Sequence, residues 1–208
     1  MDNGKYQQQH QTPFMKTLDD NYWSSRYADN TAAWDTGSIT SPLKKYFEQL
    51  QDKNISILIP GCGNSYEAEY LLQNGFTKIT LIDISTVLCK KIEEGFSEYL
   101  SKGLTIICGD FFRQEGQYDL IVEQTFFCAL DISLRKNYAE KMQQLLKPAG
   151  KLVGVLFNRE FENNPPFGGS EEEYRKLFEP YFSIEIMEAC YNSIEKRAGA
   201  ELFVIFKK

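Results

Sequence analysis

Short apolar runs, separated by segments with helical spacing, dominate the chain from residue 55 onward. The runs at 55–59, 78–84, 104–108, 118–123 and 151–157 are nearly continuous in apolar residues, as is typical of strands buried on both faces of a parallel sheet. We expect helices between and around them, at residues 42–50, 65–72, 86–100, 131–146 and 170–178. The last of these helices is expected to begin with a capping box of Ser170 and Glu173. The pattern predicts an α/β fold with helices on both faces of the sheet.

The end of the chain has a different pattern. Residues 182–187 and 200–206 alternate between apolar and polar positions, as half-buried strands do, and the link between them contains no helical segment. Two strands joined in this way most simply form an antiparallel pair. We therefore expect a Rossmann-like, seven-stranded sheet that is mostly parallel and has an antiparallel last strand.

The pattern also divides the chain into three parts. Residues 1–12 are polar and rich in glutamine, which predicts a disordered tail. His10 lies in this tail and is expected to be inert, since a catalytic base needs a fixed position. Residues 13–50 are expected to form a helical segment that covers a cofactor site, whose residues are described below. Residues 51–208 predict one α/β domain, in which residues 158–170 form a long substrate-side loop.

Composition and charge disfavour several classes of function. The 208 residues carry a net charge of −6, whereas generic binding to nucleic acid needs a basic face. No apolar run approaches the ~20 residues that cross a bilayer, and the N-terminus lacks the apolar core of a signal peptide. The five cysteines are dispersed and there is one histidine, which indicates neither a metal site nor a disulfide framework. We expect a cytoplasmic monomer that acts on a small molecule and binds neither nucleic acid nor membrane.

The strongest chemical signal is a glycine turn at the end of the first predicted strand. Gly61 and Gly63 let a ligand approach the backbone without a Cβ in the way, and Asn64 or Ser65 is expected to cap the helix that follows. Asp83 ends the next apolar run, where a carboxylate accepts hydrogen bonds from a ribose diol. Together these residues predict a cofactor that contains adenosine.

Aromatic residues gather ahead of the first predicted strand. Trp23 and Tyr27 are four residues apart and share a helix face, and Trp34 precedes a turn. One interpretation is that these rings only attach an N-terminal helix to the domain. The other is that they cover the cofactor, because aromatic faces attract a cation such as a sulfonium by roughly 0.5–2 kcal/mol.

Further candidates follow the third and fourth predicted strands. Asp110 and Phe111 suit an adenine ring, with an ordinary turn acid and a core phenylalanine as the alternative. Glu123 and Gln124 end the fourth strand, where an open α/β sheet binds its ligands. Glu123 is the nearest candidate for a catalytic base, and a solvated strand-end acid is an equally good interpretation.

Two arginines are candidates for attracting an anionic substrate. Arg159 lies in the loop after the fifth predicted strand, and Arg197 lies between the last two strands. For Arg197 we favour instead a surface ion pair with Glu195 or Glu201.

From about Tyr22 to the end, the chain resembles the thiopurine methyltransferase-like family of class I S-adenosylmethionine (SAM)-dependent methyltransferases, which includes plant thiol and halide methyltransferases. The stretches that carry the resemblance are Trp23 with Tyr27, Trp34-Asp-Thr-Gly37, Ile59-Pro-Gly-Cys-Gly63, Leu81-Ile-Asp-Ile-Ser85, Gly109-Asp-Phe-Phe112, Tyr118 to Leu130, Leu145-Leu-Lys-Pro-Ala-Gly150 and Pro165-Pro-Phe167. Family members often have Trp in place of Tyr27, Asp-Tyr in place of Glu123-Gln124, and Gly in place of Ala149.

The resemblance implies a role for individual residues around a SAM molecule that lies across the strand ends. Gly61 and Gln124 are expected at its methionine part and Asp83 at its ribose. The adenine contacts are assigned to Asp110 and Phe111, and the lining of the pocket to Trp23, Tyr27, Trp34 and the glycine turn that includes Gly63. Phe167 is expected on the substrate side, together with Arg159 and Arg197.

The activity implied is transfer of a methyl group from SAM to a small molecule, most simply a thiol, a thiopurine or a halide. Two alternatives stay open. An NAD-dependent Rossmann oxidoreductase shares the glycine turn and the strand-end acid, but it usually has a third glycine where Tyr66 stands. A non-catalytic SAM-binding protein would bind the cofactor and methylate no acceptor.

Overall fold

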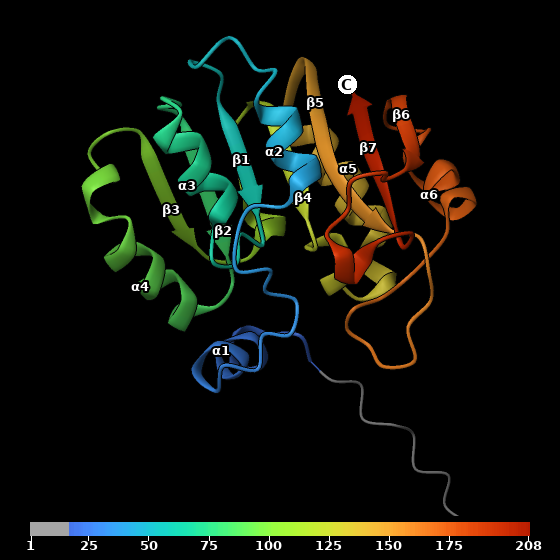
Figure 1. Cartoon of the computed structure of the whole chain (residues 1–208), viewed down its shortest axis with the longest axis horizontal. Helices are drawn as coiled ribbons and strands as arrows, with labels where there is room; N and C mark the ends of the chain where they lie inside the picture. The colour runs from blue at the N-terminus through green and yellow to red at the C-terminus, as the bar shows by residue number, and fades with distance from the viewer. Residues whose placement is uncertain (1–16) are drawn as a thin grey trace, which may run out of the picture.

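A seven-stranded sheet lies at the centre of the computed structural model, which describes residues 17–208 (Figure 1). The predicted tail at 1–12, with His10, lies outside the described residues. The strands are β1 (Ile57–Pro60), β2 (Ile79–Asp83), β3 (Leu104–Cys108), β4 (Tyr118–Gln124), β5 (Leu146–Phe157), β6 (Ser183–Ala189) and β7 (Glu201–Lys207). Their order across the sheet is β3-β2-β1-β4-β5-β7-β6.

The direction of the strands confirms the expected topology. Strands β1 to β5 pair in parallel, and β7 lies between β5 and β6 and is antiparallel to both. The strand order reverses at β1, whose neighbours are β2 and β4. Open α/β sheets bind ligands outside the carboxyl ends of the strands at such a point.

Helices cover both faces of the sheet, because successive residues of a strand point to opposite sides. Ile57 and Ile59 pack with residues of α2, α3 and α4, whereas Leu58 packs in the cluster that contains residues of α5 and α6. The α-helices are α1 (Asp20–Ala28), α2 (Ser41–Phe47), α3 (Tyr66–Gln73), α4 (Thr86–Gly95), α5 (Arg135–Leu145) and α6 (Glu171–Phe178). Short 3-10 helices are η1 (Ser97–Tyr99), η2 (Phe111–Arg113), η3 (Phe127–Ala129), η4 (Ile132–Leu134) and η5 (Glu195–Arg197).

Three element boundaries differ by four or five residues from those that the pattern predicts. Helix α4 ends at Gly95 and not at residue 100, because glycine has a low helix propensity. Helix α5 begins only at Arg135, since the residues before it form η4. Strand β5 begins earlier than expected, at Leu146, and the backbone N–H of Ala149 donates to the carbonyl of Lys208 (3.2 Å).

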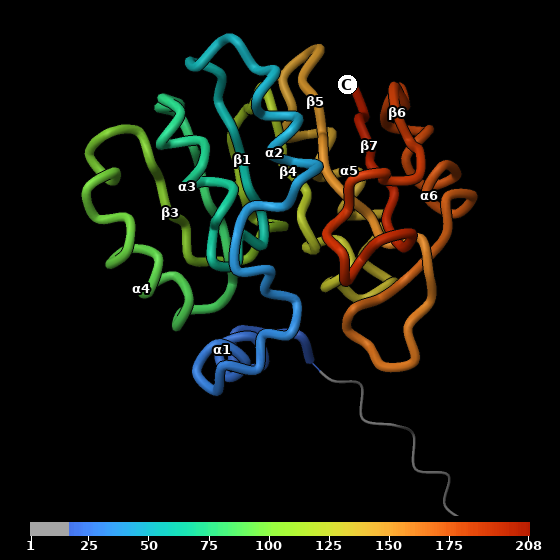
Figure 2. Tube along the Cα trace, viewed as in Figure 1, coloured from blue at the N-terminus to red at the C-terminus, as the bar shows by residue number. Residues whose placement is uncertain are grey.

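Two segments far apart in the sequence flank the end of the sheet at which β1 to β4 finish. Figure 2 shows the blue chain through α1 and the orange loop after β5 at this end. Asp20 of α1 accepts hydrogen bonds from the backbone N–H (2.9 Å) and hydroxyl (3.1 Å) of Thr86. Since Thr86 is the first residue of α4, these bonds attach α1 to the start of that helix.

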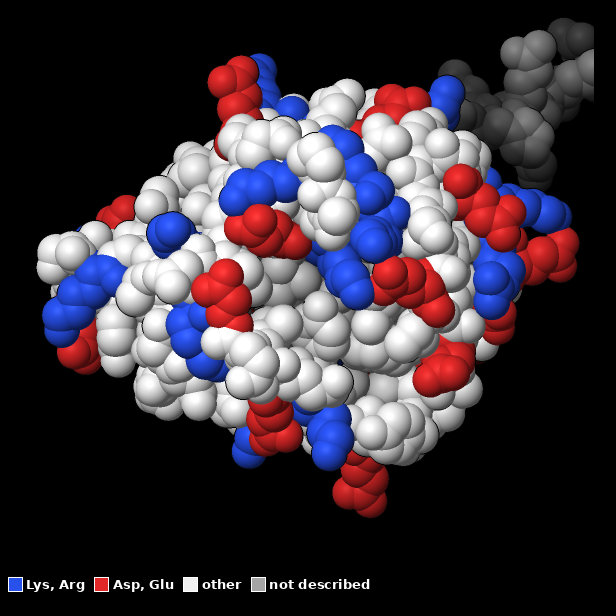
Figure 3. Space-filling model, turned by 90° about the horizontal axis from the view of Figure 1, so that it is seen from above, with Lys and Arg blue, Asp and Glu red and all other residues white. Residues whose placement is uncertain are grey.

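The opposite end of the sheet carries charges of both signs. Figure 3 looks onto this end, and the basic side chains on it are interrupted by acidic ones. Among the helices of residues 17–208, none combines the length and the apolar character that crossing a bilayer requires.

Helix α6 begins with a capping box that the sequence pattern predicts, and it provides a test of the fold. The Ser170 hydroxyl accepts from the backbone N–H of Glu173 (3.4 Å), and the Glu173 carboxylate accepts from the backbone N–H of Ser170 (2.8 Å). Ser170→Ala should lower the free energy of unfolding by about 1 kcal/mol in urea titrations followed by circular dichroism. Ser101→Ala, in an exposed turn, is the control, and equal midpoints for both variants would contradict the cap.

Candidate active site

The turn after β1 has an unusual backbone. Gly61 (φ +55°), Gly63 (φ +52°) and Ser65 (φ +61°) are all in the left-handed region. Ser65 precedes α3, but the predicted side-chain cap by Asn64 or Ser65 is wrong, because the Ser65 hydroxyl donates to the carbonyls of Cys62 (3.3 Å) and Gly63 (3.2 Å) instead. The turn is therefore closed on itself, and the first N–H groups of α3 have no side-chain cap from it.

The two glycines of this turn meet different surroundings. Among residues 17–208, and apart from its chain neighbours, a Cβ added to Gly63 would meet only the Tyr27 hydroxyl within 4 Å, at 3.6 Å, so space remains beside this residue. A Cβ added to Gly61 would lie 2.2 Å from the ring of Phe126, so packing against that ring already requires a glycine. Contact of Gly61 with the methionine part of SAM stays a prediction.

Asp83 lies at the end of β2 and is 9% exposed. Its carboxylate accepts hydrogen bonds from the backbone N–H groups of Ser85 (2.9 Å) and Gly63 (3.4 Å). Burial raises the pKa of Asp83, and these backbone donors partly oppose the rise. A carboxylate has about four acceptor positions, so two are left for hydroxyl donors of a ligand. The sequence-predicted acid is therefore placed beside the glycine turn.

The three predicted aromatic residues form one cluster above this turn. The ring of Trp34 makes edge contacts with Trp23 (centroids 5.5 Å apart) and with Tyr27 (5.8 Å). Burial, followed by the charge of Asp83, raises the pKa of Tyr27, so its phenol is neutral at physiological pH. Tyr27 also packs against the core cluster that contains Ile57 and Ile59, which agrees with the interpretation that the rings attach the N-terminal helix to the domain. Its contact with a cofactor stays a prediction.

Asp110 and Phe111 follow β3 with contacts that match the alternative interpretation. Asp110 is exposed and accepts a hydrogen bond from the backbone N–H of Phe112 (2.9 Å), as an ordinary turn acid does. Phe111 is 5% exposed and packs in the core against Phe126 (centroids 5.1 Å apart) and Tyr138 (6.0 Å). The adenine contact of these two residues stays a prediction.

Glu123 is buried and holds the loop that follows β4. The interpretation of Glu123 as a solvated strand-end acid is therefore wrong. Glu123 is 1% exposed, and one carboxylate oxygen accepts from the backbone N–H groups of Phe126 (2.7 Å) and Phe127 (2.9 Å). The other oxygen accepts from the hydroxyl of Tyr138 (2.5 Å). Burial raises the pKa of Glu123 to about 7. The role of Glu123 as a catalytic base stays a prediction.

Gln124 lies next to Glu123 and points to the other face of the sheet, toward the N-terminal segment. Its side-chain oxygen accepts from the hydroxyl of Thr40 (3.0 Å), which is itself buried. Its side-chain nitrogen is also buried and has no hydrogen-bond partner among residues 17–208. An orphaned donor at a strand end is costly unless a ligand accepts from it. This atom is therefore well suited to an oxygen of a bound cofactor.

The predicted substrate-side residues are held in three different ways. Arg197 pairs with Glu201 as expected, but this pair is buried (9% and 4% exposed), so the predicted surface location is wrong. Arg159 is exposed and lies over the ring of Phe161 in its own loop (4.9 Å). The backbone N–H of Phe167 donates to the carbonyl of Cys128 (2.7 Å), which places the loop beside the end of β4.

Two buried charged residues were not predicted from the sequence. Glu67 in the first turn of α3 is 5% exposed, and burial raises its pKa to about 7. The spacing of residues 67, 68, 71 and 72, all buried, is the signal that could have indicated it. Arg135 donates to the carbonyls of Phe167 (3.3 Å) and Gly168 (2.6 Å), and nothing in the local pattern indicates this bond.

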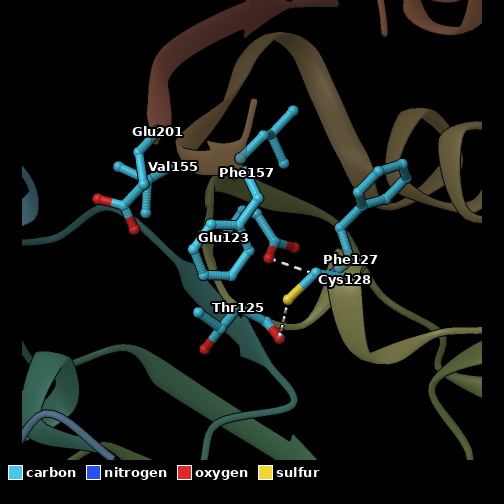
Figure 4. A pocket seen from close by; sticks show the side chains of 8 residues that line it. Glu123, Thr125, Phe127, Cys128, Val155, Phe157 and Glu201 are labelled. Carbon is cyan, nitrogen blue, oxygen red and sulfur yellow. Dashed lines mark hydrogen bonds between the residues drawn. The ribbon is translucent and has the colours of Figure 1, made fainter. Parts of the chain in front are cut away.

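A narrow hollow opens between the ends of β4 and β5 and the start of β7. About 210 Å³ lies between its atoms, part of it open to solvent, but with the side chains as they stand it has no room for a water molecule, so an acceptor would enter only after these side chains move. Figure 4 shows Glu123 of β4, Cys128 of η3 and Phe157 of β5 around the hollow. The full lining is Glu123, Thr125, Phe127, Cys128, Val155, Leu156, Phe157 and Glu201. Mainly apolar walls and two acids therefore lie next to the glycine-turn site.

The strand order defines the class of fold to which the protein belongs. The chain is similar to the Burkholderia thailandensis 1,6-didemethyltoxoflavin-N1-methyltransferase, solved with S-adenosylhomocysteine (TM-score 0.76, 14% identity, 91% of this chain and 86% of that chain). It is also similar to the magnesium protoporphyrin IX methyltransferase of Synechocystis PCC 6803 (TM-score 0.69, 15% identity, 91% and 97%). The fold is that of the Rossmann-like methyltransferases.

The family follows from the sequence comparison. The family model described as thiopurine S-methyltransferase (TPMT) matches residues 18–205, and the chain belongs to this family. It is 30% identical over 192 residues to a probable thiol methyltransferase 2 of Arabidopsis thaliana, covering 89% of this chain and 84% of that protein. It is 28% identical over 178 residues to a thiopurine S-methyltransferase of Photobacterium profundum, covering 78% and 83%.

Membership of this family makes the chain a SAM-dependent methyltransferase and decides against the NAD-dependent oxidoreductase. The residues present fit the cofactor. Asp83 has acceptor positions left, Gly63 has space beside it, and the side-chain nitrogen of Gln124 lacks an acceptor. These three features suit SAM on physical grounds alone, without reference to the family.

The buried acid Glu67 predicts a pH-dependent stability. Burial raises its pKa from the ordinary 4.5 to about 7, so the folded protein binds this proton more tightly than the unfolded chain. The resulting stabilisation is present below pH ~4.5 and is lost as the pH rises through ~7. Urea titrations at pH 4.5 and pH 8 should therefore show Glu67→Gln gaining up to about 3 kcal/mol relative to the natural chain at the higher pH.

The matched control is Glu69→Gln, an exposed acid on the same helix. Its difference from the natural chain should be the same at both pH values. If Glu67→Gln behaved like this control, the carboxyl of Glu67 would titrate normally.

Proposed function

We propose that the protein transfers the methyl group of SAM to the sulfur of a small, uncharged thiol. The observation that carries this proposal is the lining of the hollow beside the glycine turn, which is apolar apart from Thr125, Cys128 and the two acids Glu123 and Glu201. The relatives support sulfur as the acceptor atom, because they include proteins named thiol, thiopurine and thiocyanate methyltransferases.

An anionic acceptor, such as thiocyanate or a halide, is disfavoured by the charges around the hollow. A buried anion needs a cation or several donors directed at it. None of the residues that line the hollow is a cation. The nearby guanidinium of Arg197 already donates to Glu201 (3.3 Å) and to the carbonyl of Trp34 (2.9 Å). A neutral thiol avoids the repulsion that an anion would meet beside the two acids.

On the cofactor side, we assign the ribose to Asp83 and the methionine end to Gln124 and the glycine turn. Trp23, Tyr27 and Trp34 would exclude water and place aromatic rings near the positive charge. When bound, SAM supplies a methyl group on a sulfonium, whose leaving group is a neutral thioether that needs no proton. The work of the chain is therefore alignment, which can contribute ~7–11 kcal/mol.

The one proton in the proposed reaction is that of the acceptor thiol. Glu123 lines the hollow, and its pKa of about 7 suits a base that works near neutral pH. Glu123 would take up the proton of the acceptor thiol, and SAM, when bound, would supply the methyl group that the thiol sulfur receives. The products are a methyl thioether and S-adenosylhomocysteine.

We also propose that the protein acts as a monomer in the cytoplasm, without nucleic acid or a membrane as partner. Its five cysteines are free thiols, which supports a reducing compartment. The charges of both signs on the face in Figure 3 give no support to a nucleic-acid partner. The large apolar side chains that are most exposed, Val87, Leu100, Ile132 and Tyr191, are scattered along the chain.

The ribose role of Asp83 gives the sharpest test of the cofactor site. Asp83→Asn keeps an oxygen that can accept from the backbone N–H of Ser85, but it loses the charge. A hydrogen bond to a charged group contributes about 1.5–3 kcal/mol, so calorimetry should show SAM bound about 10- to 100-fold more weakly. Asp52→Asn, in an exposed turn, is the control. An unchanged affinity for Asp83→Asn would refute the ribose contact.

The acceptor class is tested by competition at pH 7 with SAM that carries a labelled methyl group. A short alkyl thiol should be methylated with a kcat/KM at least about tenfold above those of thiocyanate and iodide, a difference of about 1.4 kcal/mol. Preference for either anion would overturn the neutral-thiol assignment. Tight binding of SAM with no product from any acceptor would indicate the non-catalytic alternative.

A further inference from the structure

The loop between α1 and α2, residues 29–40, is the part of the chain that carries Trp34, and we call it the cover loop. Its end is attached to the sheet by Thr40, whose hydroxyl donates to the side-chain oxygen of Gln124 (3.0 Å). The helix before it is attached through Asp20 to Thr86. The middle of the loop needs its own attachment, because loop backbone without buried contacts opens easily.

Polar contacts reach the middle of the cover loop at two residues, Asp35 and Trp34, and they differ in burial. Asp35 is exposed and accepts from the side-chain nitrogen of Asn64 (2.6 Å) and from the hydroxyl of Tyr66 (3.4 Å). A hydrogen bond at such a position competes with water and contributes little. The other contact is the hydrogen bond from Arg197 to the carbonyl of Trp34 (2.9 Å), and Arg197 is 9% exposed. This buried bond is therefore the stronger attachment.

Arg197 is itself held on several sides. Its guanidinium donates to Glu201 (3.3 Å) and lies over the ring of Phe157 (5.4 Å). Glu201 is the first residue of β7 and pairs in register with Phe157, the last residue of β5. The backbone N–H of Arg197 donates to the carbonyl of Ile194 (2.8 Å), which fixes the turn η5. A rigid part of the sheet therefore positions the guanidinium that reaches Trp34.

We propose that Arg197 is a positioning residue that holds the backbone of Trp34, and with it the cover loop, over the cofactor site, and that Glu201 orients its guanidinium. This inference rests on the proposed function for the cofactor contact of Trp34. Because Glu201 and Phe157 also line the hollow, the same residues join the wall of the acceptor site to the cover of the cofactor site. Arg197 thus acts through Trp34 and not by touching the acceptor.

The test uses Trp34 as its own reporter. The chain has two tryptophans, so Trp23→Phe leaves Trp34 as the single one. In this background and without added cofactor, Arg197→Ala should raise acrylamide quenching of Trp34 fluorescence by at least about twofold, since a released loop exposes the ring. Arg197→Lys, which keeps one donor and the charge, should recover part of this protection, and Glu201→Gln should give an intermediate value.

Arg175→Ala is the matched control, because this arginine also donates to a glutamate, Glu171 (2.9 Å), and to a carbonyl, that of Met187 (3.4 Å), but on α6. Its quenching should equal that of the background. If Arg197→Ala fails to fold, amide exchange at residues 34–40 in Arg197→Lys and Glu201→Gln gives the same reading. Quenching and exchange unchanged in every Arg197 and Glu201 variant would overturn the proposal.

Kinetics separate a positioning role from contact with the acceptor. When fewer molecules have the cover loop in place, the apparent affinity for SAM falls in proportion, so Arg197→Ala should raise the Kd and the KM for SAM about tenfold and change kcat less. A higher KM for the acceptor alone, with normal quenching, would instead assign Arg197 to the acceptor site. If no form bound SAM, the proposed function would fail, while the quenching result would still report on the attachment of Trp34.

Discussion

Buried carboxylates at the ends of parallel strands are the constraint on which the site depends. The loops that leave these strands carry backbone N–H groups that water cannot reach, and each needs an acceptor. Asp83 accepts from Ser85 and Gly63, and Glu123 accepts from Phe126 and Phe127. Without these carboxylates the loops around the switch point would have orphaned donors and no fixed shape.

This arrangement has an electrostatic cost that also prepares the site for chemistry. Burial raises the pKa of Asp83, Glu67 and Glu123, which means that each charge is held in surroundings that disfavour it. Backbone donors reduce the cost without removing it. A ligand that brings hydroxyl donors or a positive charge to this edge reduces the cost further. The strand ends thus favour a cofactor with a ribose diol and a sulfonium.

Much of the fold could be predicted from the sequence because strand burial and helix spacing are local signals. The strand at 104–108 and the capping box of α6 match the structure residue by residue. Asp83 could be placed beside the glycine turn because the carboxyl ends of parallel strands share one edge. The burial of Arg197 and Glu123 could not be predicted, since it depends on Trp34 and Tyr138, which are remote in sequence.

The position of Phe111 also depends on residues that are remote in sequence. A local pattern of acid and aromatic after a strand fits an adenine ring and a core position equally well. The structure places Phe111 against Phe126 and Tyr138 in the core, and the ring of Phe126 in turn fills the space over Gly61. One packed cluster of aromatic rings thus reaches from the residues after β3 to the glycine turn. Which ring packs against which depends on the tertiary structure and cannot be read from any one segment of the sequence.

The two carboxylate oxygens of Glu123 have different hydrogen-bond partners. One oxygen accepts both backbone N–H groups of the loop, whereas the other accepts only from the hydroxyl of Tyr138. A proton taken up on the second oxygen leaves the first pair of bonds intact, and the Tyr138 hydroxyl, which both donates and accepts, can turn to receive it. The loop beside the hollow therefore keeps its shape in both protonation states of Glu123.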